Sequence, residues 1–346
     1  MKQILTLLLV AGLANVANAQ VQDDVPYLTK SLSSANIQKV QAETSGGNIT
    51  VTGGTDAEAK IEVYVYPNNG RKNVLSKDEI EKRLQEDYDF SITTADNKLT
   101  AIAKPKNKKW DWKRALSVSF RIYVPRNVTT NLITSGGNIH IAHLNGVQDF
   151  RTSGGNLHVE DLAGKIKGVT SGGNIHLSDS KDDITLITSG GNIHAKNSNG
   201  KLELTTSGGN VTLESLTGNV DATTSGGNVS GNTIGGELSA VTSGGNVSLQ
   251  DLSCSVSAST SGGHMTINIK ELGSYVKLAN SGGNVSLTIP GNKGMDLRLS
   301  GDKVKADKLN NFSGTIEDDL IDGKLNGGGI PVTIKGHSGR VTLTIK

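Results

Sequence analysis

The sequence is poor in cysteine, in aromatic residues and in net charge, and each shortage excludes a class of protein. One cysteine, Cys254, among 346 residues excludes an internal disulfide, and we expect it to be a small buried residue rather than a reactive thiol. Lysine plus arginine number 35 against 33 aspartate plus glutamate, so the formal net charge of +2 favours no nucleic acid partner. Four phenylalanines, six tyrosines and two tryptophans predict a thin, aliphatic interior.

Glycine is abundant instead, at 43 residues, and much of it belongs to a repeated tetrapeptide. Ser-Gly-Gly-Asn returns at a constant spacing, and Ser-Gly-Gly-His follows at the same spacing from Ser261. The regular copies begin at Ser135, Ser153, Ser171, Ser189, Ser207, Ser225 and Ser243. Seven equal intervals indicate that each interval is one structural unit.

Within each unit, counted from its serine as position 1, apolar and polar residues alternate around two centres. Positions 5 and 7 are mostly aliphatic, as in Ile175 and Leu177, and positions 14 and 16 are aliphatic, aromatic or small, as in Ile184. This alternation predicts two short strands, each with one buried face. Gly-Gly precedes the first strand and a single glycine, such as Gly164, precedes the second. We expect both to adopt backbone angles that a Cβ would forbid.

The constant length of the unit decides the fold class. A series of hairpins would not need identical spacing, whereas stacked coils do, because a slip of one residue would turn every buried side chain outward. We therefore predict an all-β, single-chain parallel β-helix, or solenoid, with about 18 residues per coil. The crossover rule predicts a right-handed path.

The N-terminus predicts export. Residues 1–19 contain one lysine, an apolar run and Ala17-Asn18-Ala19, which together are typical of a Sec-type signal peptide with its cleavage site. We expect an extracytoplasmic protein, whether periplasmic, on the cell surface or secreted. After removal of the signal no run approaches the ~18 apolar residues of a spanning helix, so no transmembrane segment is expected.

The rest of the chain divides into three parts: residues 20–134 as N-terminal coils and cap, 135–290 as regular repeats, and 291–346 as irregular C-terminal coils and cap. Within the first part, residues 76–88 predict a helix, because Ser76 and Glu79 form a capping-box pattern and an apolar stripe follows. We expect this helix to bulge from the solenoid or cover its end. An early repeat copy at Ser45 precedes Ser135 by five regular intervals, but the intervening residues break the repeat pattern, so the agreement in spacing can be accidental.

Residues 104–114 form a basic segment around two tryptophans and are a candidate ligand-binding loop. Indole rings stack on sugars while cations hold phosphate or carboxylate groups. The residues expected to bind are Trp110, Trp112, Lys108, Lys109 and Arg114. The alternative is a solvated loop whose tryptophans fold back onto an aromatic N-terminal core, which holds most of the aromatic residues of the chain.

Position 6 is histidine in four consecutive units, at His140, His158, His176 and His194. Since positions 5 and 7 face inward, these imidazoles are expected to form an exposed row with steps of ~4.8 Å. Such a row could bind Zn²⁺, Cu²⁺ or Ni²⁺, with Glu160 as a carboxylate ligand, or respond to acid. The alternative is that repeat duplication copied one tolerated surface residue. No other cofactor is expected.

Position 4 carries asparagine in each regular unit. A calcium-binding roll needs aspartate at such turns, because neutral amides do not supply the charge of a Ca²⁺ cage. We predict instead a structural ladder in which each amide bonds the neighbouring coil. Its members are Asn138, Asn156, Asn174, Asn192, Asn210, Asn228 and Asn246.

Ser-Gly-Gly-Asn-Ile, followed by an alternating strand, a glycine corner and a Thr-Ser-Gly-Gly restart, resembles a bacterial β-strand-repeat family of unknown function whose members are called "putative adhesins". The entry Tyr123-Val-Pro-Arg-Asn-Val128 is similar to that family as well. The resemblance covers roughly residues 36–346. It implies an extracytoplasmic β-solenoid, and it brings no catalytic residues with it. Many relatives have aspartate where this chain has asparagine.

The outward positions 13 and 15 alternate in charge, and no nucleophile with a base, phosphate loop or zinc signature occurs in the sequence. We therefore expect no enzymatic activity. The favoured function is a binding, adhesion or envelope scaffold protein whose partner is an envelope component, a glycan or another protein surface. Two alternatives remain open: a metal-binding or envelope-sensing scaffold that uses the histidine row, and a polysaccharide-active β-helix enzyme. End-to-end self-association of solenoids also remains open.

Overall fold

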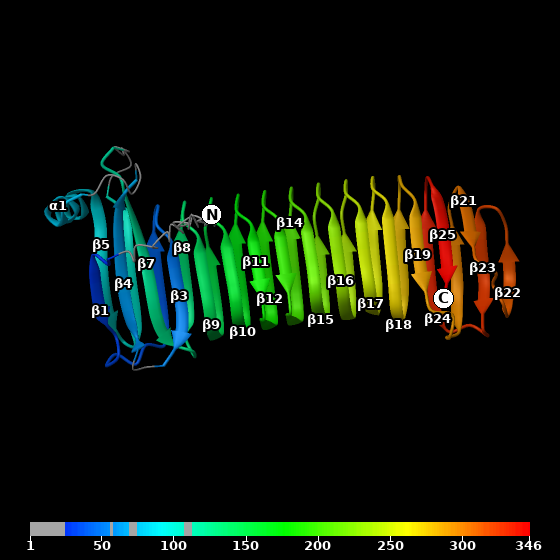
Figure 1. Ribbon diagram of the computed structural model, residues 1–346, viewed down its shortest axis with the longest axis horizontal. Coiled ribbons are helices and arrows are strands. Elements are labelled where there is room, and N and C mark those ends of the chain that lie inside the picture. Colours follow the sequence, from blue (N-terminus) through cyan, green and yellow to red (C-terminus); the bar gives the residue numbers. More distant parts are fainter. Residues whose placement is uncertain (1–24, 56–57, 69–74, 107–112) are drawn as a thin grey trace, which may run out of the picture.

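The computed structural model describes residues 25–55, 58–68, 75–106 and 113–346. It contains one long sheet that winds into a rod, with the strands side by side along the long axis (Figure 1). The predicted all-β parallel solenoid is confirmed, together with its small N-terminal helix.

The elements fall into three groups along the rod. The N-terminal elements are β1 (Leu28–Ser31), β2 (Lys39–Thr44), β3 (Ile49–Gly54), β4 (Lys60–Pro67), α1 (Lys77–Asp87), β5 (Tyr88–Ala95), β6 (Lys98–Pro105), β7 (Leu116–Pro125) and β8 (Thr129–Thr134). The regular coils contain β9 (Ile139–Arg151), β10 (Leu157–Thr170), β11 (Ile175–Ser178), β12 (Lys181–Thr188), β13 (Ile193–Lys196), β14 (Asn199–Thr206), β15 (Val211–Thr223), β16 (Val229–Val241), β17 (Val247–Thr260), β18 (Met265–Asn280) and β19 (Val285–Ile289). The C-terminal elements are β20 (Met295–Ser300), β21 (Lys303–Ala306), β22 (Phe312–Ile316), β23 (Leu320–Leu325), β24 (Ile330–Gly336) and β25 (Arg340–Ile345).

Each regular coil pairs in parallel with the next at the spacing of the sequence repeat. Leu157 of β10 pairs with Ile139 of β9 on one side and with Ile175 of β11 on the other. Like residues therefore form columns along the axis, and the position-5 column is completely buried. Its members are Ile139, Leu157, Ile175, Ile193, Val211, Val229 and Val247.

Position 10 adds a buried column that the alternating pattern did not predict. It contains Leu144, Leu162, Leu216, Ile234 and Leu252, with Ser180 and Ser198 in the two middle coils. The two serines do not interrupt the hydrogen bonding, because the Ser180 hydroxyl accepts from the backbone N–H of Leu162 at 3.1 Å and that of Ser198 accepts from Ser180 at 3.2 Å. Most coils are consequently one long bent strand rather than two short ones.

Close approach explains one glycine of each repeated Gly-Gly, and the expectation that Gly-Gly adopts special backbone angles was wrong. Neither Gly172 nor Gly173 has positive φ. A Cβ on Gly173 would lie 1.9 Å from the carbonyl oxygen of Gly155 in the preceding coil, whereas one on Gly172 would have 3.7 Å to its nearest atom. The second glycine is thus required by coil stacking, and the structure does not explain the first.

Positive φ occurs instead at positions 9 and 12. The position-12 glycines have φ between 98° and 118°, as the single-glycine corner predicted. Position 9 is left-handed without glycine, with φ of 47° at Asp161 and 58° at Thr233. Aspartate and asparagine tolerate this region, whereas a β-branched threonine is an outlier there.

A buried threonine before each serine ties neighbouring coils together. The hydroxyl of Thr188 donates to the carbonyl of Gly173 at 2.8 Å and accepts from the N–H of Gly191 at 3.2 Å. The same pair of bonds recurs at Thr152, Thr170, Thr206, Thr224, Thr242 and Thr260. Each hydroxyl thereby satisfies the backbone groups of two buried or half-buried glycines.

The coils at the N-terminal end are not stacked in chain order. β2 and β3 form a coil that lies between β8 and β9 on one side and β6 and β7 on the other, although β6 and β7 come later in the chain. The Ser45 repeat copy therefore stacks directly on the Ser135 copy. Their separation by five regular intervals in the sequence therefore does not correspond to five stacked coils.

The C-terminal end has the same design. β24 pairs with β18 and with β20, and β25 pairs with β19 and with β21, so the last segment of the chain lies between two earlier coils. The red β25 lies among orange strands in Figure 1 for this reason. Antiparallel β23 and β22 complete this end. The longer interval between Ser261 and Ser281 is absorbed by register shifts between β17 and β18.

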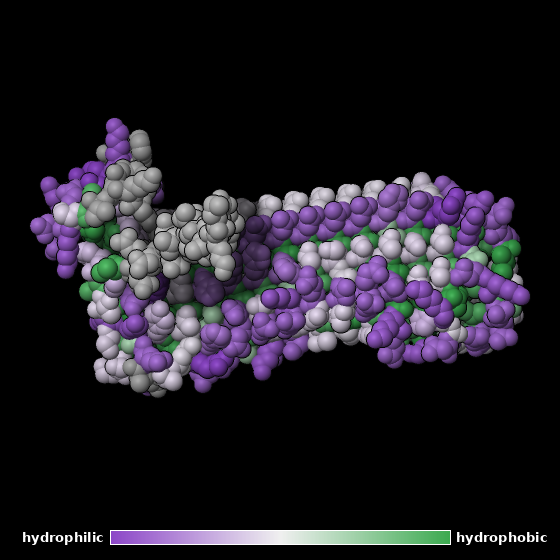
Figure 2. Space-filling view, viewed as in Figure 1, coloured by the Kyte–Doolittle hydropathy of each residue, from purple (hydrophilic) through white to green (hydrophobic). Residues whose placement is uncertain are grey.

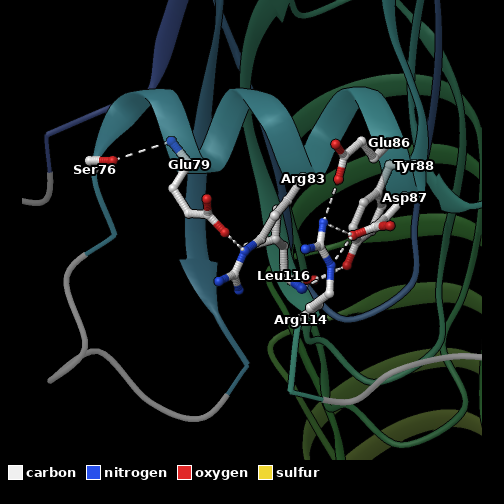
Figure 3. Close-up of polar contacts among 8 residues, drawn as sticks. All are labelled: Ser76, Glu79, Arg83, Glu86, Asp87, Tyr88, Arg114 and Leu116. Carbon is white, nitrogen blue, oxygen red and sulfur yellow. Dashed lines mark hydrogen bonds and ion pairs between the residues drawn. The ribbon is translucent and has the colours of Figure 1, made fainter.

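Helix α1 lies beside β5 at the N-terminal end of the rod (Figure 1). It begins after Ser76, whose hydroxyl accepts from the backbone N–H of Glu79 at 3.2 Å, so the predicted start is confirmed. The Glu79 carboxylate does not complete the capping box. It accepts from the Nε of Arg83 at 2.6 Å instead (Figure 3).

Candidate functional site

The exposed columns of the regular coils form an ordered polar surface. Figure 2 shows rows of hydrophilic and intermediate side chains that run along this part of the rod. The rows arise because parallel in-register coils repeat each outward position at the strand spacing of about 4.8 Å.

Position 4 forms a continuous hydrogen-bonded column. The side-chain oxygen of each asparagine accepts from the backbone N–H of the next at 2.7–2.8 Å; for example, Oδ1 of Asn174 accepts from the N–H of Asn192. The column includes Asn138, Asn156, Asn174, Asn192, Asn210, Asn228 and Asn246. Carboxylates would accept the same bonds, but stacking like charges ~4.8 Å apart would cost about 1 kcal/mol per pair in water and more near the protein.

The column extends past both ends of the regular repeat. Asn48 joins it through the N–H of Asn138, although the two are distant along the chain. His264 replaces asparagine by accepting from the N–H of Asn284 through Nδ1 at 3.1 Å, and Asn284 in turn accepts from Arg340. Asn48 and Asn284 show that the ladder continues into the coils that are out of chain order.

Position 6 brings the four row histidines together on consecutive strands. His140, His158, His176 and His194 are direct register partners. The ring centroids of His158 and His176 are 5.1 Å apart with an interplanar angle of 10°, so these two rings stack. The two flanking pairs are 6.2 Å apart and are tilted or edge-on.

The environments of the row histidines differ. Burial, together with the neighbouring His176 and His140, lowers the pKa of His158 below its ordinary 6.5. His194 Nε2 lies 3.2 Å from the Glu214 carboxylate, yet the atom is shielded from solvent and the contact lacks hydrogen-bond geometry. Glu160 is exposed, and no ion pair joins it to His158 in the described part of the chain.

Beyond the histidines, position 6 carries hydroxyl groups. Thr212, Ser230, Ser248 and Thr266 continue the column coil by coil. The hydroxyls of Ser230 and Thr212 are within 3.3 Å. One face of the rod is therefore divided lengthwise into an imidazole segment and a hydroxyl segment.

Toward the N-terminal end the same column continues through Thr50 to Arg121. The Arg121 guanidinium lies 4.4 Å above the ring of Tyr64 and donates to its hydroxyl at 3.2 Å, while Tyr64 donates to Glu62. This cluster was not foreseen, because it depends on the antiparallel pairing of β4 with β7, which the sequence pattern does not specify.

A second unpredicted cluster lies at the position-9 corner. The Asp161 carboxylate contacts Nδ1 of His143 at 2.8 Å and the guanidinium of Arg126 at 2.6 Å. The His143 hydrogen bond, with help from Arg126, lowers the pKa of Asp161 despite partial burial. His143 and Asp161 occupy the same position of successive units, which was a signal in the sequence that could have indicated this contact.

A cavity with a volume of about 520 Å³ lies at the N-terminal end, between α1 and β5. Its wall includes Tyr27, Leu84 and Phe90, with Glu81 and Lys106 at polar positions. Tyr88 also lines it, and burial raises the pKa of Tyr88 to about 12. The Tyr88 hydroxyl is held on the backbone of β7, so this ring is a structural wall (Figure 3).

The predicted tryptophan loop falls mostly outside the described residues, which exclude Lys108, Lys109, Trp110 and Trp112. Arg114 is described and pairs with Glu86 at 2.7 Å and with Asp87 at 3.0 Å (Figure 3). Its guanidinium therefore contacts the end of α1.

Cys254 is buried, and burial raises the pKa of its thiol to about 12, which leaves it protonated at neutral pH.

The described residues contain no group of three or more histidine, cysteine, aspartate or glutamate side chains placed to hold one metal ion. Within the same ranges, no helix has the length and apolarity needed to cross a membrane.

Residues 179–344 match the family model described as Toastrack DUF4097. The matched segment begins just before β12 and includes the out-of-order C-terminal coils. The matched family is a domain of unknown function, which agrees with the resemblance to a repeat family of unknown function. No curated protein matches the sequence.

Two solved structures are similar over most of their length. One is a "putative cell adhesion protein" from Clostridium sporogenes, with 10% identity, a TM-score of 0.22, and coverage of 92% of this chain and 98% of that one. The other is a "putative adhesin" from Bacteroides fragilis, with 15% identity, a TM-score of 0.26, and coverage of 92% and 96%. Scores this low carry no argument about function.

Proposed function

We propose that this protein is a non-enzymatic, extracytoplasmic solenoid that binds an envelope component, a glycan or another protein through its exposed columns. The observation that carries the proposal is the unbroken in-register stacking of outward positions from β9 to β17. A surface that repeats at about 4.8 Å presents the same group many times, which suits a partner that is itself repetitive, such as a polysaccharide.

The hydroxyl segment is the part of the surface best suited to a neutral glycan. Thr212, Ser230, Ser248 and Thr266 offer short donors and acceptors that cost little conformational entropy to order. Many weak contacts along one polymer add through effective concentration rather than through one deep pocket. We therefore expect modest affinity per coil and strong dependence on ligand length.

The proposal is tested by a pull-down with the untagged protein against purified envelope polysaccharides and envelope proteins. The informative variant is Ser230→Lys/Ser248→Lys, which places long charged side chains on the hydroxyl segment. Its matched control is Ser239→Lys/Ser257→Lys on the outward position 15 of the same coils. Binding that the first variant abolishes and the control keeps supports the proposal.

Two outcomes contradict it. Equal binding by both variants would remove the hydroxyl segment as the contact surface. Release of soluble oligosaccharides from any polysaccharide in the panel would favour the enzymatic alternative. A Trp110→Ala/Trp112→Ala variant in the same assay tests the loop hypothesis separately, because that loop stays a prediction.

A further inference from the structure

The central pair of the histidine row has a geometry that its neighbours lack. His158 and His176 face each other across adjacent parallel strands, with rings stacked at a centroid separation of 5.1 Å. Their side chains emerge from positions whose neighbours on either side, such as Val159 and Leu177, are buried, so both imidazoles are confined to the outer surface. His158 is half-buried and His176 is exposed.

The spacing of two adjacent strands suits a shared metal ion. Imidazole nitrogen lies about 2.0–2.1 Å from Zn²⁺, so two ligand nitrogens on one ion are separated by at most roughly 4.2 Å. Strands ~4.8 Å apart bring two rings to this range after a small tilt toward one another. The flanking pairs, at 6.2 Å and with tilted or edge-on rings, need larger rotations.

The pair also has access to water. His176 is exposed and His158 is half-buried on the outer face of the sheet, where their rings stack on each other. An ion held there by both imidazoles would complete its coordination with water.

The groups around the pair determine which ion fits. The charged residues on the same outer face are Glu160 on β10, Lys196 on β13 and Glu214 on β15, with His140 and His194 in the row itself. Two imidazoles and water are ligands for Cu²⁺, Ni²⁺ and Zn²⁺, whereas Ca²⁺ and Mg²⁺ require oxygen ligands. Within the described ranges no third ligand is already in place.

We propose that His158 and His176 together bind one first-row divalent ion, Cu²⁺, Ni²⁺ or Zn²⁺, at the outer face of β10 and β11. The site uses two protein ligands, so it holds the ion reversibly and keeps open coordination positions. It goes beyond the proposed binding function and does not depend on it.

The repeat supplies its own control substitutions. Later coils carry threonine or serine at position 6 with the same backbone, as at Thr212, so His158→Thr/His176→Thr replaces the pair with residues this fold already accepts there. His337 lies in an exposed turn far from the row in sequence, and His337→Ala is the matched control for loss of one histidine.

Titration calorimetry with NiCl₂ on the untagged protein at pH 7.5 tests the site. We expect about one ion per chain in the native protein and in His337→Ala. His158→Thr/His176→Thr removes both ligands, so the Ni²⁺ affinity is expected to fall by at least roughly 10–100-fold. That is the loss typical of removing only a residue that hydrogen-bonds to a metal ligand. Unchanged affinity in the double variant, or no binding by the native protein, would overturn the proposal.

Electron paramagnetic resonance with Cu²⁺ gives an independent readout of the ligands. Hyperfine coupling to two imidazole nitrogens is expected in the native protein and in His140→Thr. Coupling to only one nitrogen in the native protein would contradict a shared ion, even if calorimetry shows binding. Thermal unfolding of each variant without metal establishes that the fold is retained.

Discussion

Ile49 lies beside Ile139 as its direct partner in the adjacent parallel strand, although the two are far apart along the chain. The hydrogen bonds of the regular repeat are kept across this junction, since the Thr134 hydroxyl donates to Gly47 as Thr152 does to Gly137. The turn therefore sets the register in which coils stack, whatever the order of the coils along the chain.

Gly173→Ala is expected to destabilise the protein and Gly172→Ala is not. The new methyl group in Gly173→Ala would overlap the Gly155 carbonyl, and overpacking of this kind costs about 1–3 kcal/mol or more. Gly172 has room for a methyl group and no positive φ, so its substitution leaves stability unchanged or raises it by up to about 1 kcal/mol. Denaturant unfolding of the two variants measures the difference, and equal stability would contradict the close-approach explanation.

Thr188→Val keeps the shape of the side chain but removes the hydroxyl that bridges two coils. The carbonyl of Gly173 and the N–H of Gly191 would lose their buried partner, at about 1–3 kcal/mol for each group left unsatisfied. Thr185→Val, on an outward and half-exposed position of the same strand, is the control and is expected to have little effect. Comparable losses in both variants would show that the hydroxyl does not stabilise the turn.

Stability is expected to fall as the solution is acidified through the titration of His158. Its pKa is lowered in the folded protein, so the unfolded chain binds the proton first. The stabilisation is complete above the ordinary pKa of 6.5 and is lost as the pH falls through the folded value.

Thermal unfolding at pH 7.5 and at pH 5.5, with a chelator present, measures this effect. The decrease between the two pH values is expected to be smaller in His158→Thr than in the native protein. Glu160, Lys196 and Glu214 are unchanged in both proteins, so their contributions cancel in the comparison. An identical decrease would show that His158 does not contribute.

The regular coils were predictable because one spacing determines burial and register at the same time. A unit of constant length whose positions 5 and 14 are apolar has only one alignment that keeps both inside. The buried column at position 10 was not predicted, because Ser180 and Ser198 interrupt its apolar character. The positive φ at position 9 was not predicted, because Ser215 and Thr233 are not typical of left-handed backbone.

The order of coils at the two ends was not predictable from the pattern. Alternation in β6 or β24 specifies which face is buried, but not which open sheet edge the strand will pair with. The Arg121 and Tyr64 contact depends on such a pairing, so no spacing in the sequence indicates it. The histidine row, in contrast, is placed by the repeat itself.

The docking of α1 on the N-terminal end is expected to depend on Tyr88 more than on Arg114. The Tyr88 hydroxyl donates to the carbonyl of Leu116 at 2.9 Å and accepts from its N–H at 2.7 Å in a buried position, whereas the ion pairs of Arg114 with Glu86 and Asp87 are partly exposed. Tyr88→Phe leaves buried backbone groups unsatisfied at about 1–3 kcal/mol, and Arg114→Met loses less than about 1 kcal/mol per exposed pair.

Hydrogen exchange of the α1 amides measures the difference. In Tyr88→Phe exchange is expected to be faster by roughly tenfold or more, because each 1.4 kcal/mol changes the opening equilibrium about tenfold. In Arg114→Met the acceleration is expected to be smaller, and amides of the distant β16 serve as the internal control in both variants. Equal acceleration in the two variants would show that the exposed ion pairs hold the helix as firmly as the buried tyrosine does.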